Sequence, residues 1–162
     1  MNKVVKNAFL IIVAILIFIL LLVFGSSKNN TLFYLESKYY NSGNKIKMDS
    51  NEIDKISNES FILFTYNSVC GMSRPCEEVF DNVFKELKID YISIPFDEFK
   101  KTKYYDTVKY APSIIIIKDG EIFAYLDANE DSHLDYYQKE SSFKSWLSGR
   151  IYFEAIENSC VK

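Results

Sequence analysis

The sequence has few of the residues on which several common protein classes depend. Its 162 residues include three cysteines, three prolines, five glycines and one histidine. Three cysteines are too few for a disulfide-rich scaffold. A zinc site of cysteine and histidine ligands would need His133 together with all three cysteines. No two of these residues are separated by two intervening residues, the spacing that zinc ligands usually have. We therefore expect no metal and no cofactor.

Positive charge is also scarce. Lysine and arginine number 19 against 22 acidic residues, so the formal net charge is −3, and no tract is rich in basic residues. Nucleic-acid binding usually requires a basic surface, so nucleic acid is excluded as a partner. The length leaves room for one compact domain of roughly 100 residues. An aromatic content of 16% lets that domain bury a sizeable apolar core.

One long apolar run stands near the N-terminus. Residues 8–24 are 17 consecutive apolar residues, which as a helix cover about 26 Å of a hydrocarbon core roughly 30 Å thick. We predict a cytoplasmic N-terminus at 1–7 and a transmembrane anchor at 8–25. The alternative is a cleaved signal peptide, for which Gly25-Ser26-Ser27 would supply the cleavage site; its apolar region is normally about 7 to 15 residues.

The lysines around this run indicate its orientation. Lys3, Lys6 and the amino terminus precede the run, whereas only Lys28 and Lys38 follow it at short range. This bias predicts a single-pass protein of the plasma membrane, with the N-terminus in the cytoplasm and the C-terminal domain extracytoplasmic. Disulfides form and persist in that compartment.

Beyond the anchor, apolar periodicity predicts a polar spacer at 26–48, a domain at 49–149 and a C-terminal tail at 150–162. Within the domain we expect alternating helices and strands. The expected helices are Asn51–Ile56, Arg74–Lys88, Asp97–Tyr110 and Ser141–Ser148, and the expected strands are Phe61–Tyr66, Tyr91–Phe96, Ser113–Ile117 and Ile122–Leu126.

The last two strands are expected to form a hairpin. Asp119-Gly120 lies between them, and an Asp-Gly pair favours a type I′ turn, which needs positive φ at both central residues. Strands joined through helices run parallel, while a hairpin is antiparallel. The sequence therefore predicts an α/β fold with a mixed four-stranded sheet and flanking helices.

Several local features resemble the thioredoxin fold. Pro75-Cys76 begins a helix after the first core strand, and Val108–Pro112 leads directly into a strand and the Asp-Gly hairpin. The resemblance covers about Ser50–Ser148. In thioredoxins the proline at the position of Pro112 is cis and packs beside the active-site cysteines. The resemblance thus implies that Ala111 and Pro112 form the surface against which a substrate's extended chain lies.

The cysteine loop departs from the thioredoxin pattern. Five residues separate Cys70 from Cys76, whereas thioredoxins have two residues between their cysteines. Counted from the helix, Ser73 takes the position of the nucleophilic cysteine; counted from the strand, Cys70 falls near it. Both registers allow a disulfide, because a loop of this length can bring two Cα atoms within about 4.4 to 6.8 Å.

Thiol exchange is the chemistry that this loop favours. The attacking species is a thiolate, and a helix N-terminus stabilises negative charge. We predict Cys70 as the attacking thiol and Cys76 as the resolving thiol, supported by Arg74 and Pro75. The function predicted is a membrane-tethered thiol-disulfide oxidoreductase acting on exported proteins or peptides, recycled by a membrane or soluble redox partner.

Two other functions stay open. Cys70 and Cys76 could form a structural disulfide in a redox-silent adaptor of a membrane assembly, since Val69 replaces the tryptophan that precedes the first cysteine in thioredoxins. The chain could also be an export accessory protein, because it resembles small anchored thioredoxin-like proteins of bacteriocin-transport accessory families. Cys160, in the tail, is an odd cysteine that is free, incidental or bridged to another chain.

Overall fold

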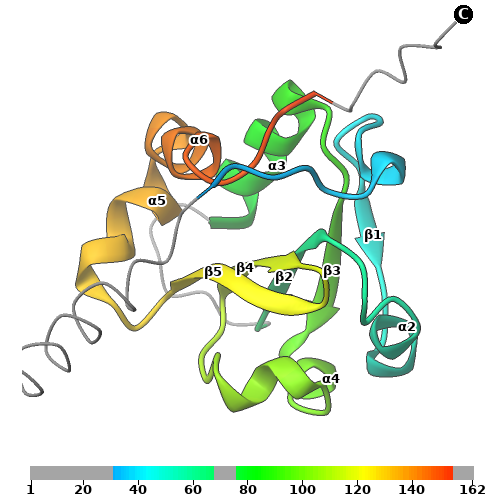
Figure 1. Ribbon diagram of the computed structural model, residues 1–162. Helices are drawn as coiled ribbons and strands as arrows, with labels where there is room; N and C mark the ends of the chain where they lie inside the picture. The colour runs from blue at the N-terminus through cyan, green and yellow to red at the C-terminus, as the bar shows by residue number, and fades with distance from the viewer. Residues whose placement is uncertain (1–30, 68–75, 155–162) are drawn as a thin grey trace, which may run out of the picture. The chain divides into compact units, whose positions relative to one another are not determined.

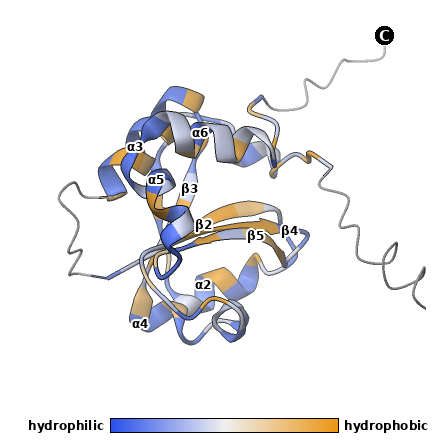
Figure 2. Ribbon diagram, turned by 90° about the vertical axis from the view of Figure 1, so that its left-hand side faces the viewer, coloured by the Kyte–Doolittle hydropathy of each residue, from blue (hydrophilic) through white to orange (hydrophobic). Residues whose placement is uncertain are grey.

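A central β-sheet lies between two layers of helices in the computed structural model, which describes residues 31–67 and 76–154. Figures 1 and 2 show one helical layer on each side of the sheet. The first layer contains α3 (Cys76–Leu87), α5 (Leu134–Gln138) and α6 (Glu140–Ser148). The second contains α2 (Ser50–Lys55) and α4 (Phe96–Phe99).

The sheet has five strands, in the order β1-β3-β2-β4-β5. The strands are β1 (Lys45–Lys47), β2 (Phe61–Tyr66), β3 (Tyr91–Pro95), β4 (Ser113–Lys118) and β5 (Glu121–Asp127). The first three are mutually parallel, and β4 is antiparallel to both β2 and β5. The mixed α/β architecture is as predicted.

The prediction of four strands was wrong, because β1 adds a fifth strand at the edge. Its sequence, Lys-Ile-Lys, pairs with β3 in the register Lys45↔Tyr91. A strand with one apolar residue has no recognisable period, and lysines are typical of an exposed sheet edge. The pairing therefore depends on backbone hydrogen bonds to β3 that the sequence pattern does not reveal.

The central strand β2 is buried on both faces, as its apolar sequence predicts. On one face the ring of Phe64 meets that of Phe80 in α3, with centroids 5.5 Å apart. On the other face Phe61 meets Tyr104, with centroids 6.4 Å apart. Figure 2 shows the strands as the apolar middle of the domain. Because side chains cover β2 on both faces, its sequence does not alternate between apolar and polar residues.

Part of the predicted polar spacer packs into the domain. Phe33, Leu35 and Tyr39 are all buried in the core. Phe33 pairs in parallel with Ile151, which belongs to the predicted tail, and Figure 1 shows these two ends of the described chain running side by side. The folded unit thus includes residues on both sides of the segment 49–149.

The helices follow the predictions in part. Asp49 caps α2: its side chain accepts a hydrogen bond from the Glu52 amide, and the Glu52 side chain accepts one from the Asp49 amide. The predicted helix Asp97–Tyr110 is wrong, since the chain instead forms α4 and a 3₁₀ turn, η2 (Lys103–Asp106). Thr102 donates its hydroxyl to the Phe99 carbonyl, 2.8 Å away, at the point where α4 ends.

Two further short helices were not predicted: η3 (Asp131–His133) and α5. Neither is long enough to produce a complete apolar stripe in the sequence. Another 3₁₀ turn, η1 (Ser37–Tyr39), lies within the predicted spacer. Among residues 31–67 and 76–154, no helix has the length and apolarity needed to cross a membrane, and the predicted anchor at 8–25 lies outside these ranges.

The predicted hairpin is confirmed. Asp119 and Gly120 have φ values of 50° and 80°, as a type I′ turn requires. The tip docks on the connection between α2 and β2, where the Gly120 amide donates to the Glu59 carbonyl at 3.0 Å. A Cβ atom on Gly120 would lie 2.0 Å from the Ser57 carbonyl oxygen. Glycine is therefore needed at this position for both conformation and space.

Candidate functional site

The structure describes part of the predicted site. Cys76, Ala111 and Pro112 lie within the described ranges. Cys70, Arg74 and Pro75 fall in the segment 68–75, outside those ranges, so their predicted roles stay predictions. Cys160 also lies outside the described part of the chain.

Cys76 is the first residue of α3 and is almost fully buried, with 3% of its surface exposed. It is buried because it continues the apolar stripe of the helix: Val79, Phe80 and Val83 follow at the spacing of one helical face. Its position at the helix N-terminus places it beside backbone N–H groups that have no partner within the helix. Such groups stabilise negative charge on a thiolate.

The predicted substrate-binding segment lies at the end of the sheet where β2 finishes. Thr65 pairs with Ser113 at the start of β4, so Pro112 stands beside the end of β2 that leads toward the cysteine loop. The peptide bond between Ala111 and Pro112 is cis, as the resemblance implies. Both residues are half-buried, and the adjacent Tyr110 is exposed.

Hydrogen bonds fix the backbone on both sides of Ala111. The Ser113 hydroxyl donates to the Tyr110 carbonyl at 2.8 Å. The Tyr137 hydroxyl lies 2.9 Å from the Pro112 carbonyl oxygen. Ala111 itself makes no hydrogen bond with any described residue. Its amide and carbonyl groups are therefore available to a bound extended chain.

Tyr137, on α5, connects this segment with α3. Its buried hydroxyl also lies 2.8 Å from the Leu126 carbonyl oxygen, and its ring meets that of Phe80 with centroids 5.5 Å apart. Burial raises the pKa of Tyr137 above its ordinary value, and the negative charge of a Cys76 thiolate raises it further. Tyr137 thus remains a neutral hydrogen-bond donor beside Cys76 and Pro112.

The sequence gives little indication of this role for Tyr137. The only signal is the tyrosine pair at 136–137, and such pairs usually lie at the edge of a core. Its contact with Pro112 depends on where α5 packs, which no local pattern specifies.

A charged network holds the first two turns of α3 against the sheet. Lys45 of β1 forms ion pairs with Glu77 and Asp81, and the Tyr91 hydroxyl donates to Asp81. Partial burial acts to lower the pKa of Lys45, but the hydrogen bonds and charges of the two carboxylates outweigh burial and raise it. The network fixes the helix end that carries Cys76.

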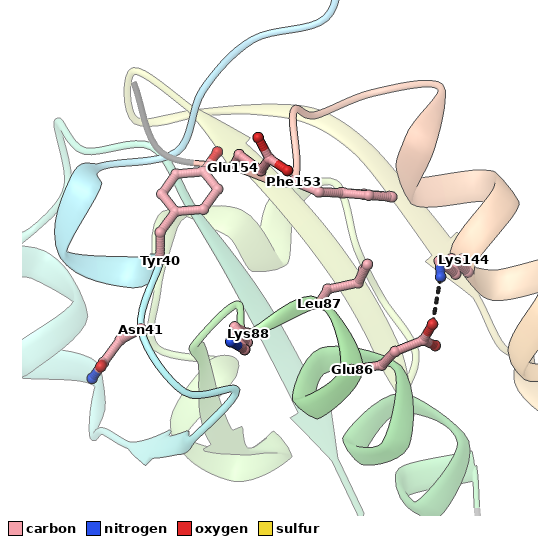
Figure 3. A pocket seen from close by; sticks show the side chains of 8 residues that line it. All are labelled: Tyr40, Asn41, Glu86, Leu87, Lys88, Lys144, Phe153 and Glu154. Atoms are coloured by element: carbon pink, nitrogen blue, oxygen red, sulfur yellow. Dashed lines mark hydrogen bonds and ion pairs between the residues drawn. The ribbon is translucent and has the colours of Figure 1, made fainter. Parts of the chain in front are cut away.

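A surface hollow lies at the opposite end of α3. Figure 3 shows Tyr40, Leu87 and Phe153 around it, with the ammonium of Lys144 paired to Glu86 at 2.6 Å. Leu87, the last residue of α3, lies about 16 Å along the helix axis from Cys76. This hollow is therefore remote from Cys76 and does not belong to the thiol site.

No metal centre is formed by the described residues: 31–67 and 76–154 contain no cluster of three or more His, Cys, Asp or Glu side chains that could hold an ion. His133 instead accepts a hydrogen bond at Nδ1 from the Asp127 amide, 3.0 Å away. That contact fixes the connection between β5 and α5.

The fold follows from the strand order, the cis bond before β4 and the cysteine at the start of α3. The domain has a thioredoxin-like fold. No protein-family model and no curated protein matches the sequence.

Solved structures of thioredoxins are similar to the chain at low sequence identity. Thioredoxin f from spinach chloroplast (long form) is 11% identical, with 70% of this chain and 90% of that chain covered and a TM-score of 0.49. A thioredoxin from Trypanosoma brucei brucei is 12% identical over 70% and 97% of the two chains, with a TM-score of 0.46. A thioredoxin from Nicotiana alata is 18% identical over 68% and 95%, with a TM-score of 0.44.

Proposed function

We propose that this protein is a membrane-tethered, extracytoplasmic thiol-disulfide oxidoreductase that acts on exported proteins or peptides through Cys70 and Cys76. The observation that carries the proposal is the position of Cys76 at the start of α3, beside Tyr137, whose hydroxyl bonds the carbonyl of Pro112. A helix N-terminus favours a thiolate, and the half-buried Ala111–Pro112 segment offers a backbone edge for a substrate chain.

The two cysteines divide the reaction between them. In the reducing direction the Cys70 thiolate attacks one sulfur of a substrate disulfide, forms a mixed disulfide and releases the other sulfur as a thiolate. Cys76 then loses its proton and attacks the Cys70 sulfur, which releases the second substrate thiolate and leaves a Cys70–Cys76 disulfide. A membrane or soluble dithiol partner returns two electrons to this disulfide. The burial of Cys76 suits the resolving step, which needs no access from solvent.

The proposed membrane tether is inferred from the apolar run 8–24 and from the lysines that precede it. An anchored domain outside the cytoplasm meets exported chains as they leave the membrane. Alkaline carbonate extraction tests this part of the proposal: a spanning anchor keeps the full chain in the membrane fraction, whereas release into the supernatant contradicts it.

Trapping the mixed disulfide tests the chemistry. In the full chain, Cys76→Ser removes the resolving thiol, so a disulfide-bonded peptide should accumulate as a stable adduct on Cys70. Cys160→Ser is the control and should resolve the adduct as the parent chain does. The reduction potential of the couple should lie above about −300 mV. A lower potential together with absence of the adduct would overturn the proposal.

The burial of Cys76 also favours a second candidate. A nearly inaccessible cysteine is typical of a structural disulfide, and a loop this short gains about 2 to 3 kcal/mol from a cross-link. In that case the domain is a redox-silent adaptor or an export accessory protein. The same potential measurement separates the two functions, because a structural bridge resists reduction.

A further inference from the structure

Three exposed apolar side chains lie on one part of the domain surface. The large apolar residues exposed in the described part of the chain are Leu32, Tyr34, Tyr110, Leu134 and Tyr152. The rings of Tyr34 and Tyr152 stack with centroids 4.3 Å apart and an interplanar angle of 24°. Leu32 lies two residues before Tyr34. We refer to Leu32, Tyr34 and Tyr152, which are 38%, 38% and 41% exposed, as the aromatic patch.

Backbone hydrogen bonds hold the patch in place. The Tyr152 amide donates to the Phe33 carbonyl at 3.0 Å, and the Tyr40 hydroxyl donates to the Tyr152 carbonyl at 2.9 Å. Phe33 and Leu35 point into the core, so the alternation of an extended chain directs Leu32 and Tyr34 outward. The patch is thus a fixed feature of the folded domain.

The surface hollow borders this patch through Tyr40, and its lining includes two lysines and two glutamates. Figure 3 shows Lys88 among the residues that line the hollow, and no carboxylate of the described residues lies within ion-pair distance of its ammonium. Glu86 is already paired with Lys144, which leaves Glu154 as the opposing charge on the rim. The charges of the hollow therefore balance and do not repel anionic lipid, and the ammonium of Lys88 can pair with the phosphate of a lipid headgroup.

The position of the patch in the chain identifies what covers it. The predicted anchor ends at Gly25, and Leu32 is seven residues beyond it. Even a fully extended chain of that length spans at most about 25 Å. Tyrosine is enriched at membrane–water interfaces, where its ring lies among lipid chains and its hydroxyl reaches water.

We propose that the aromatic patch lies in the interfacial layer of the membrane that anchors the protein. This inference rests on the tether of the proposed function, but not on its redox chemistry. The patch adjoins the hollow through the bond of Tyr40 to Tyr152, and the hollow lies at the C-terminal end of α3, about 16 Å along the helix from Cys76. Contact between the patch and lipid therefore turns the thiol site away from the membrane, toward chains that have been exported.

Depth-dependent fluorescence quenching tests this orientation. The full chain with Tyr34→Trp is placed in nanodiscs of phosphatidylcholine with a minor share of phosphatidylglycerol, and the signal of the parent chain, whose single Trp146 is nearly buried, is subtracted. The quenchers are lipid brominated near the top of the acyl chain and aqueous acrylamide. Tyr152→Trp is a second probe of the patch, and Tyr110→Trp is the matched exposed control.

Brominated lipid should quench the indole at positions 34 and 152 at least twofold more than the indole at position 110, and acrylamide should show the reverse order. Equal acrylamide quenching at all three positions would overturn the proposal. Protection from acrylamide without quenching by lipid would overturn it as well, in favour of a protein contact. Carbonate extraction of the same variants distinguishes failure of the tether from failure of the patch proposal. A chain that stays in the membrane fraction while acrylamide reaches its patch contradicts only the contact between the patch and lipid.

Discussion

The hydroxyl of Tyr137 lies 2.9 Å from the carbonyl oxygen of Pro112. Through this contact α5 holds the cis segment before β4 while the Tyr137 ring packs on Phe80 of α3, one helical turn after Cys76. One buried side chain therefore joins the two parts of the candidate site. Its raised pKa keeps the hydroxyl protonated, so it acts as a donor over the whole physiological range.

Tyr137→Phe should destabilise the domain. The change removes the one hydroxyl proton that the Pro112 and Leu126 carbonyl oxygens share, at 2.9 and 2.8 Å, while the ring still fills the core. Loss of such a hydrogen bond costs about 1 to 3 kcal/mol of unfolding free energy. Urea denaturation followed by circular dichroism measures the change.

Tyr136→Phe is the matched control for that variant. Tyr136 is half-buried and its hydroxyl makes no hydrogen bond with a described residue. Its unfolding free energy should stay within about 0.5 kcal/mol of the parent value. Equal losses in the two variants would show that the hydroxyl of Tyr137 has no special part in the fold.

Gly120→Ala should destabilise the hairpin strongly. The residue has a φ of 80°, and its added Cβ would lie 2.0 Å from the Ser57 carbonyl oxygen. Overpacking and the left-handed conformation together cost about 2 to 4 kcal/mol. Gly149→Ala is the control, because Gly149 has a φ of −81° and the nearest atom to its Cβ would be 3.9 Å away. Thermal unfolding should separate the two variants by several degrees.

Asp90→Ala should loosen the turn before β1. The buried Asp90 carboxylate accepts hydrogen bonds from the Ser42 amide at 3.2 Å and the Asn44 amide at 2.7 Å. Hydrogen bonds to a charged acceptor contribute about 1.5 to 3 kcal/mol, so the variant should lose about that much stability. Asp97→Ala, which removes an exposed carboxylate, should change stability by less than about 0.5 kcal/mol in the same denaturation assay.

Tyr104→Phe should stabilise the domain by about 1 kcal/mol, because the buried Tyr104 hydroxyl has no hydrogen-bond partner among residues 31–67 and 76–154. Burial, with the charges of Glu121 and Asp54, raises the pKa of Tyr104 to about 12. The unfolded chain ionises near pH 10, so the parent loses stability as the pH rises from about 10 toward 12.

The advantage of the Tyr104→Phe variant over the parent should therefore be constant below pH 9.5 and grow between about pH 10 and 12. Denaturation of both proteins across this range measures it. The other buried tyrosines titrate in both proteins, so they do not contribute to the difference. A constant difference at all pH values would contradict the assigned environment of Tyr104.

Much of the fold could be predicted because its signals are local. The apolar run Phe61–Tyr66 predicts a strand covered on both faces, and Asp119-Gly120 predicts a hairpin through its backbone conformation. The stripe that begins at Cys76 predicts α3. Each signal depends on neighbours in the chain, so it can be found without knowing what packs against it.

The helix predicted across Asp97–Tyr110 was wrong, because the local preferences of this segment are nearly balanced. Its composition allows a helix, but the Thr102 hydroxyl binds the Phe99 carbonyl and the chain turns into η2. The free-energy difference between a continued helix and a chain turned by such a side-chain hydrogen bond is small. Packing against the sheet, which composition does not describe, decides such a case.

By itself, the sequence determined the strands β2 to β5, the hairpin, the helix that begins at Cys76 and the proline before β4, because each follows from backbone preference or from the period of burial. Only the tertiary structure decided the fifth strand, the contact of Tyr137 with Pro112 and the stacking of Tyr34 on Tyr152. Those relationships join segments far apart in the chain. They arise because packing brings complementary surfaces together, and no residue's local sequence encodes its distant partner.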